Sequence, residues 1–427
     1  MASLLNGSRA RSLLCTSVFL FILPAAFASA AQTVVCNGGD GSFQYKFRTG
    51  VAVLVGPQKN EGFAAHACEA RLEWDKQNLV VEPHSWQVDI DALGIDVGLG
   101  SPVVAFQTKN TDLDGFMRYE IYSLKKPPQK LRTIAGGDWY SAADTDLDGR
   151  VEIWTDDAKA INGFDDLQPS AFDFAPPVVL RFEKKKLIDV SAEFQPQYDR
   201  RIDALRAQLD PSQLRDFKAS DGKLKSLFPP TPQEWARLRA TKVKVLEIAW
   251  CYLYSGRDGQ AWDALASMWP AADLDRIRAA ILSARAHGIR REVEGVSSGL
   301  AAGIKVKKVT IFNPPTQADP RSNDLAWAYA PGMSGPGQVD RTFSADTYPV
   351  SILMSRPVPA EGSSVSLRAE VPVELVIDSA GKVRSAKAIA NPDHDLIEAT
   401  AGWKFVPAFR YGHPVACRIQ MGITPYQ

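Results

Sequence analysis

An acidic hexapeptide occurs twice in the N-terminal half of this chain, with oxygen-bearing side chains at alternate positions. The copies begin at Asn110 and Asp144, 34 residues apart. The polar residues and the closing glycines are Asn110, Asp112, Asp114 and Gly115 in the first copy and Asp144, Asp146, Asp148 and Gly149 in the second. Oxygen ligands at this spacing let a short loop surround Ca²⁺, and glycine permits the backbone angles of the turn. The spacing indicates either a Ca²⁺ loop or a metal-free Asp-Gly hairpin turn.

The residues after the second acidic turn show which of two known kinds of calcium loop the sequence fits better. Glu152 stands at the ninth position of that copy, but the twelfth is Thr155, where an EF-hand requires a bidentate glutamate. A strand-like run also follows where an EF-hand has a helix. The spacing instead resembles the calcium loops of FG-GAP (integrin-like) β-repeats. That resemblance implies a Ca²⁺ ion that stiffens the turn, held by Asp144, Asp146, Asp148 and Glu152 in the second copy and by Asn110, Asp112 and Asp114 in the first.

Alternating apolar residues dominate residues 31–195 and predict a mainly-β domain. Phe43, Tyr45 and Phe47 alternate with polar residues, as in a half-buried strand. Further candidate strands are Leu72–Trp74, Leu79–Val81, Val103–Phe106, Tyr119–Tyr122, Val151–Trp154 and Val178–Phe182. Glycine, aspartate and proline clusters separate these runs at turn spacing. The pattern leaves open whether the sheets form a sandwich or part of a propeller.

Residues 196–300 change to helical periodicity. Thr231-Pro232-Gln233-Glu234 is a capping box with proline at the first helical position, and it predicts a helix that ends near Tyr254. Two further helices are expected, one that carries Ala261 to Met268 and one that starts near Asp273 and ends before Gly288. Residues 301–346 contain proline and glycine clusters and have the composition of a linker.

The first 30 residues have the pattern of a secretory signal peptide. Arg9 and Arg11 precede an apolar stretch, and Ala28-Ser29-Ala30 provides the small residues of a cleavage site. The apolar stretch is shorter than the roughly 20 residues of a membrane span, although retention as an uncleaved anchor is the alternative. We therefore expect a protein of the periplasm or the cell exterior without a permanent membrane span.

Four cysteines follow this segment, and an even number permits disulfides in an exported chain. Cys36 and Cys68 both lie in the β-rich region and are the expected pair. Cys251, in a helical pattern, and Cys417, in the last expected strand, are expected to be buried thiols.

The composition argues against several function classes. The chain has 45% hydrophobic and 23% charged residues, as globular proteins do, and its formal net charge is zero. A neutral chain has no overall attraction for nucleic acid. No P-loop, dinucleotide-binding glycine turn or HExxH motif is present, and the five histidines are scattered. We therefore interpret the protein as non-enzymatic; a hydrolase within the N-terminal domain is the third alternative.

The C-terminal region returns to strand periodicity and predicts the order β-β-α-β. Apolar residues alternate from Val365 to Ile377, and Asp378-Ser379-Ala380-Gly381 turns this strand into a second one. A short helix follows Asp393, and a final strand begins after Gly412. Pro372 interrupts the first strand, which suits an edge or a bulge.

Three motifs in this region resemble the TonB C-terminal domain. They are Tyr348-Pro349, Trp403-Lys404-Phe405-Val406-Pro407-Ala408 and Gly412-His413-Pro414-Val415, and the resemblance covers residues 347–427. Asn391-Pro392 departs from the family's pattern because small residues usually precede the helix.

The resemblance implies a function in protein binding, because domains of that family bind a short segment of an outer-membrane receptor by strand addition. The candidate edge runs from Val415 to Ile423, and its partner-binding residues are Val415, Ala416, Arg418 and Gln420. The alternative is that the protein's own chain covers this edge. Without a retained anchor or a long proline-rich spacer, the sequence favours a binding module over an energy transducer.

The sequence thus predicts a multidomain α+β protein with a mainly-β N-terminal domain, a helical middle segment and a TonB-like C-terminal domain. We expect a cell-envelope protein that binds a protein segment in connection with transmembrane transport. The alternative is a calcium-stiffened surface or adhesion protein in which the TonB-like domain has only a structural role.

Overall fold

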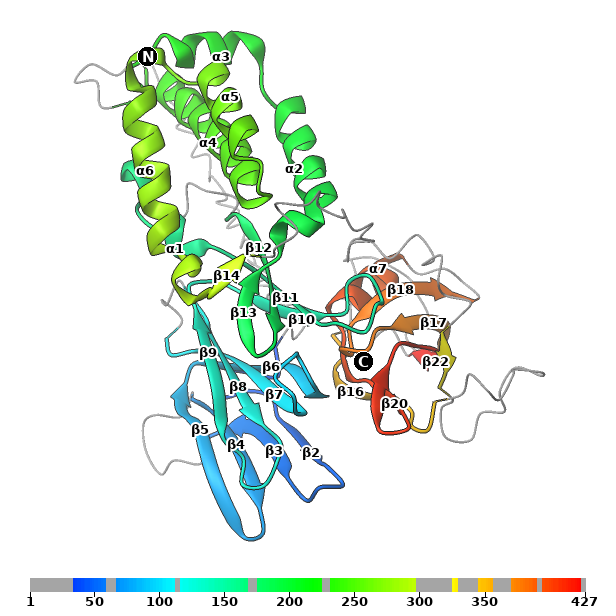
Figure 1. Cartoon of the computed structure of the whole chain (residues 1–427). Coiled ribbons are helices and arrows are strands. Elements are labelled where there is room, and N and C mark those ends of the chain that lie inside the picture. The colour runs from blue at the N-terminus through cyan, green and yellow to red at the C-terminus, as the bar shows by residue number, and fades with distance from the viewer. Residues whose placement is uncertain are drawn as a thin grey trace, which may run out of the picture. The chain divides into compact units, whose positions relative to one another are not determined.

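The structure is a computed structural model of the whole chain. It describes residues 34–58, 67–111, 116–167, 175–224, 231–296, 325–328, 345–355, 370–389 and 394–423. The expected signal peptide and most of the expected linker lie outside these residues. The order of β-sheets, helices and a second β-rich region confirms the predicted multidomain α+β class (Figure 1).

Three antiparallel sheets of successive strands build the N-terminal domain. The first contains β2 (Phe43–Lys46), β3 (Ala52–Pro57), β4 (Cys68–Trp74) and β5 (Gln77–Ser85). The second contains β6 (Gln87–Ile95), β7 (Val103–Lys109), β8 (Arg118–Ser123) and β9 (Lys130–Ala135), with β1 (Cys36–Asn37) beside β6. The third contains β10 (Tyr140–Ala143), β11 (Glu152–Asp156), β12 (Pro177–Glu183) and β13 (Lys186–Asp189), with β14 (Gly295–Val296) parallel to β13.

The second sheet is buried on both faces, so the three sheets stack in series. Ile90 and Phe106 pack toward the first sheet, whereas Ala92 and Ala105 pack toward the third. This explains why β6 and β7 consist almost entirely of buried residues, unlike a half-buried strand. The described part of this domain is therefore a series of three sheets and not a sandwich of two.

The expected disulfide is present in this domain. Cys36 of β1 and Cys68 of β4 are joined at an S–S distance of 2.04 Å, and the bond links the first sheet to the second. Cys251 and Cys417 are free and buried, as expected. Burial raises the pKa of each of these two thiols to about 12, so both are neutral at physiological pH.

The middle segment forms the helices α2 (Gln195–Ala207), α3 (Pro211–Lys218), α4 (Pro232–Tyr254), α5 (Asp258–Met268) and α6 (Leu274–His287). The predicted capping box is present, because Thr231 and Glu234 cap each other's backbone N–H groups at the start of α4. The buried face of α4, including Trp250, shares one hydrophobic core with the third sheet. Shorter turns are α1 (Ala158–Ile161), η1 (Phe164–Asp166), η3 (Ser191–Phe194), η4 (Ala271–Asp273) and η5 (Ile289–Glu292).

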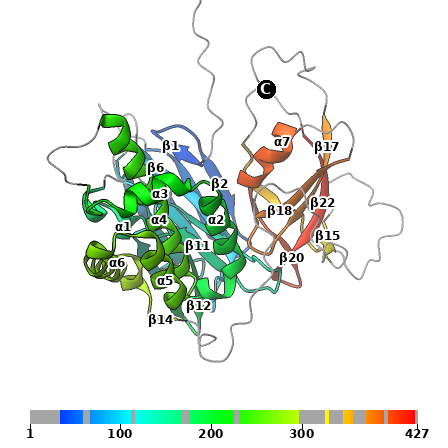
Figure 2. The same cartoon turned by 90° about the horizontal axis from the view of Figure 1, so that it is seen from above.

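The C-terminal domain has one main sheet in the order β15-β22-β17-β18. Its elements are β15 (Ala326–Trp327), β16 (Val350–Leu353), β17 (Val371–Ile377), β18 (Val383–Ala388), α7 (His394–Ala399), η8 (Thr400–Gly402), β19 (Lys404–Val406), β20 (Ala408–Arg410), β21 (His413–Val415) and β22 (Cys417–Ile423). Helix α7 lies beside the sheet (Figure 2) and contributes Leu396 to the core.

Two details of this domain differ from the sequence expectation. The final strand begins at Cys417, because Val415 belongs to a separate hairpin in which it pairs with Ala408. Pro372 lies opposite Gly422 within β17, which is a central strand and not an edge. Pro372 is the second residue of β17 and faces Ile389 beyond the end of β18, so its missing N–H affects only the end of the ladder, while its carbonyl accepts the Ile389 N–H at 2.8 Å.

Candidate functional site

The second acidic turn joins β10 to β11, and it brings three carboxylates together. One oxygen each of Asp144, Asp146 and Asp148 lies within 4.8 Å of the others. Gly149 has a φ of +85°, the left-handed conformation that favours glycine. Its N–H donates to Asp144 Oδ2 at 3.1 Å, which closes the turn. The predicted ligands of the second copy therefore converge, with the exception of Glu152.

Glu152 contacts the backbone of the turn and Arg181 of the adjacent strand. Its carboxylate is fully buried and accepts the Thr145 N–H at 3.0 Å through Oε2, while Oε1 lies 3.5 Å from a guanidinium nitrogen of Arg181. Glu152 is not part of the described acidic cluster. It supports the backbone of the turn from the sheet, since it bonds the residue next to Asp144.

The electrostatics of the turn favour a cation. Asp144 is only 1% exposed, and within the described part of the chain its Oδ1 has no hydrogen-bond partner. Burial raises the pKa of Asp144, and the charges of Asp148 and Asp146 raise it further. Asp148 is held by Arg150, whose Nε and terminal nitrogen donate at 2.9 and 2.6 Å. The oxygen-rich set fits Ca²⁺, which would relieve the repulsion among the carboxylates.

The first acidic turn is largely outside the described residues. Asp112 and Asp114 are not described, whereas Asn110 follows β7 and its carbonyl accepts the Trp86 N–H at 3.2 Å. The expectation of a first calcium loop therefore stays a prediction.

The second acidic turn also contacts the C-terminal domain, which its sequence did not indicate. The Asp144 N–H donates to Asp378 Oδ2 at 3.1 Å, and the Ser379 hydroxyl donates to Asp144 Oδ2 at 2.7 Å. Arg384 donates to the Thr145 carbonyl at 2.6 Å. Burial raises the pKa of Asp378 to about 7; Arg384 opposes this shift and Asp144 adds to it. The turn between β17 and β18 is therefore docked on the acidic turn.

Two lysines of the C-terminal domain form ion pairs with acidic residues of β6. Lys382 Nζ lies 2.5 Å from Asp91 Oδ1, and both side chains are almost completely buried. Lys404, from the Trp403–Ala408 motif, pairs with Asp89. The sequence signal that could have indicated these ion pairs is the presence of two aspartates in an otherwise apolar strand, because a buried carboxylate requires a partner.

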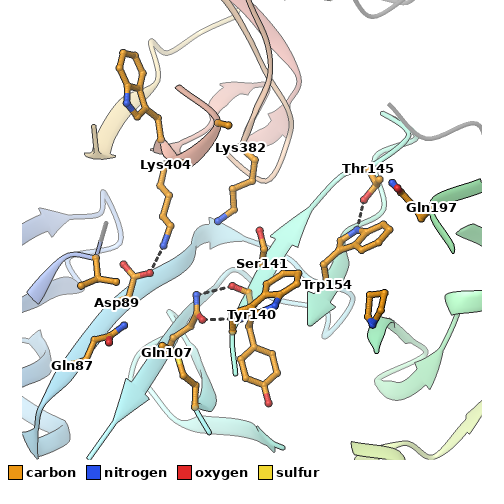
Figure 3. A pocket seen from close by; sticks show the side chains of 17 residues that line it. Gln87, Asp89, Gln107, Tyr140, Ser141, Thr145, Trp154, Gln197, Lys382 and Lys404 are labelled. Carbon is orange, nitrogen blue, oxygen red and sulfur yellow. Dashed lines mark hydrogen bonds and ion pairs between the residues drawn. The ribbon is translucent and has the colours of Figure 1, made fainter. Parts of the chain in front are cut away.

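A pocket of about 670 Å³ lies beside these ion pairs (Figure 3). Its walls come from β6, β7, β10, β11, α2, the acidic turn and the C-terminal domain. The lining residues are Val34, Gln87, Asp89, Gln107, Met117, Trp139, Tyr140, Ser141, Thr145, Trp154, Pro177, Gln197, Lys382, Ala401, Gly402, Trp403 and Lys404. Its volume is typical of sites for small molecules.

The predicted partner-binding edge is partly covered. Strand β15 pairs in parallel with β22 at Cys417 and Arg418, and the Ala328 N–H donates to the Arg418 carbonyl at 3.1 Å. Among the described strands, none pairs with the remaining edge from Ile419 to Ile423. Arg418 and Gln420 lie on the sheet face that carries Glu374, whereas Val415 and Ala416 precede the strand.

A second cluster with ligand-type side chains is exposed on α7. His394, Asp395 and Glu398 have one potential ligand atom each within 4.8 Å of the others. All three side chains are largely exposed, and such groups often approach one another without an ion. This cluster by itself indicates no site.

Comparisons of the chain with protein-family models, with curated proteins and with solved structures found no match. Among the described residues, none of the helices combines the length and the hydropathy of a membrane-spanning segment.

Proposed function

We propose that this chain is an exported, non-enzymatic cell-envelope protein whose C-terminal domain binds an extended protein segment by strand addition. The partner is a segment of the outer-membrane receptor type, and the function is linked to transmembrane transport. The edge of β22 beyond Arg418 carries this proposal: a parallel strand already pairs with the first two residues of β22, and the rest of the same edge has no partner strand in the described chain.

The direction of the backbone groups along β22 supports strand addition. The Arg418 carbonyl faces β15, so the peptide groups of Gln420 and Gly422 face the same side, because alternate residues of a strand direct their peptide groups the same way. An added segment would hydrogen-bond to these groups. The peptide groups of Cys417 and Ile419 face the opposite side, where β22 pairs with β17, so strand addition would leave that pairing unchanged.

Binding should depend on the peptide N–H of Gln420 and not on its side chain. We expect Gln420→Pro to lower affinity at least about tenfold, since it removes one donor and leaves a buried acceptor of the partner unpaired. Gln420→Ala keeps the N–H and is the matched control, with affinity close to that of the unchanged protein. Calorimetry measures this affinity with a set of overlapping synthetic peptides that cover the sequences of outer-membrane receptors.

Hydrogen–deuterium exchange of the same samples locates the added strand. Protection of the Gln420 and Gly422 amides on peptide binding is the expected result. Equal affinities of the Gln420→Pro and Gln420→Ala variants, or binding by none of the peptides, would contradict the proposal.

We also propose a calcium-stiffened turn, and the buried Asp144 Oδ1 without a hydrogen-bond partner favours it. Asp144, Asp146 and Asp148 would hold the ion, with Asp144 linked to the C-terminal domain through Ser379. The ion's role would be to neutralise the three carboxylates and stabilise the docked arrangement.

Calcium binding should raise the unfolding temperature of the full-length protein, because a ligand that binds only the folded state stabilises it. We expect Asp144→Asn to weaken Ca²⁺ binding at least about tenfold, since one charged ligand is lost. Asp395→Asn, in the exposed cluster on α7, is the control and should bind as the unchanged protein does. Calorimetry with CaCl₂ that detects no binding, or equal binding by both variants, would exclude this site.

A further inference from the structure

The pocket between the N-terminal sheets and the C-terminal domain has features of a ligand site that strand addition does not use. We propose that it binds a neutral saccharide of one or two sugar units, as found in cell-envelope glycans. The proposal does not depend on the edge of β22, because none of the pocket-lining residues belongs to that strand.

The charges around the pocket indicate that its ligand is neutral. Lys404 pairs with Asp89, and Lys382 with Asp91, so each charged group that lines the cavity has a partner of opposite charge. A charged ligand would lose hydration on entering without finding an unpaired counter-charge. This argues against phosphates, nucleotides and anionic peptides.

The aromatic surface of the pocket suits the apolar faces of sugar rings. Trp139 is 40% exposed although it lines a cavity, and it lies next to Tyr140 in the chain. Trp154 is half-buried and Trp403 is almost completely buried, so the accessible indole face among these three is that of Trp139. An exposed indole face offers a flat, electron-rich surface on which the C–H groups of a pyranose ring can stack.

Free polar groups accompany this aromatic surface. Within the described part of the chain, the Gln87 amide, the Ser141 hydroxyl and the Trp139 indole N–H form no hydrogen bond with other protein groups. Trp139 and Ser141 flank Tyr140, whereas Gln87 belongs to β6, and together the three groups provide both donors and acceptors. A ligand with apolar faces and several hydroxyl or amide groups can stack on the aromatic surface and hydrogen-bond to these polar groups. Neutral sugars combine these properties.

The walls of the pocket are held in place before any ligand binds. Both ends of the Gln107 amide bond the backbone of Tyr140, at 2.7 and 2.8 Å (Figure 3). The Trp154 indole N–H donates to the Thr145 hydroxyl at 2.7 Å, and the ring packs edge-on against Phe194. A preformed site loses less conformational entropy when it binds its ligand.

N,N′-diacetylchitobiose and its deacetylated analogue test the charge and the class of ligand together. The two disaccharides share their rings, but deacetylation replaces neutral amides with cationic amines. We expect the full-length protein to bind the neutral disaccharide at least about tenfold more tightly, measured by calorimetry and by saturation-transfer NMR. Maltose serves as a second neutral probe, which tests whether the acetamido groups are required.

Trp139→Ala should lower affinity for N,N′-diacetylchitobiose about tenfold, and Trp139→Phe should retain part of it because an aromatic face remains. Trp262→Ala, which removes a tryptophan of α5 outside the pocket, is the matched control and should bind normally. Circular dichroism checks that the variants are folded. The proposal is overturned if none of the neutral sugars binds, if the cationic disaccharide binds as tightly as the neutral one, or if Trp139→Ala binds as Trp262→Ala does.

Discussion

Replacing Lys382 by methionine should destabilise the folded protein by about 3–5 kcal/mol, because the change leaves the Asp91 carboxylate buried without its cation. Asp91 is 2% exposed and also accepts the Tyr119 hydroxyl at 2.6 Å and the Ala142 N–H at 2.7 Å. These neutral donors do not replace a positive charge. Since Lys382 belongs to the C-terminal domain and Asp91 to β6, the substitution should mainly weaken the contact between these two regions.

Lys126→Met provides a matched control for this prediction. Lys126 pairs with Asp75 at 2.8 Å, but both side chains are substantially exposed, and such a pair contributes at most about 1 kcal/mol. Hydrogen–deuterium exchange in urea follows β6 and β18 separately, since a chain of several parts need not unfold in one step. Combining Lys382→Met with Asp91→Asn should recover part of the loss. Equal stabilities of the Lys382 and Lys126 variants would show that the buried pair makes no such contribution.

Features of the fold that depend on neighbouring residues could be predicted from the sequence. The capping box at Thr231 involves residues three apart, and the alternation along β17 repeats every two residues. The acidic turn is equally local, because a glycine at its sixth position closes a loop of fixed length. Such patterns are set by backbone geometry and require no knowledge of distant partners.

Contacts between distant segments could not be predicted in this way. Lys382 and Asp91 are 291 residues apart, and Lys404 and Asp89 are 315 apart. The sequence showed two aspartates in an apolar strand, but not which cations would neutralise them. The pocket draws its walls from widely separated elements, so no single stretch of sequence indicated it. The contact of Glu152 with Arg181 on the adjacent strand β12 could not be predicted either, because it joins two separate strands.

Gly381→Ala should be among the most destabilising single changes in the C-terminal domain. Gly381 has a φ of +86°, and an added Cβ would lie 1.9 Å from the Phe405 carbonyl oxygen. This oxygen belongs to β19, and the Phe405 N–H donates to the Gly381 carbonyl at 2.9 Å, so neither segment can move without losing that bond. We expect the free energy of unfolding to fall by at least about 4 kcal/mol, because losses of this size are typical of substitutions that disrupt packed structure. Urea denaturation of the full-length protein, followed by exchange in β18 and β19, measures it.

Gly412→Ala separates the clash from the cost of the backbone conformation. Gly412 has a similar φ of +78°, but an added Cβ would meet no atom within 4 Å. This variant should lose only about 1–2 kcal/mol, the cost of a left-handed conformation in a residue with a side chain. Because Gly381 closes the turn that carries Asp378 and Ser379 to the acidic turn, its substitution should also expose the Asp144 amide to exchange, and Gly412→Ala should not. If the two variants lose equal stability, the close approach of Gly381 to Phe405 does not hold the domain together.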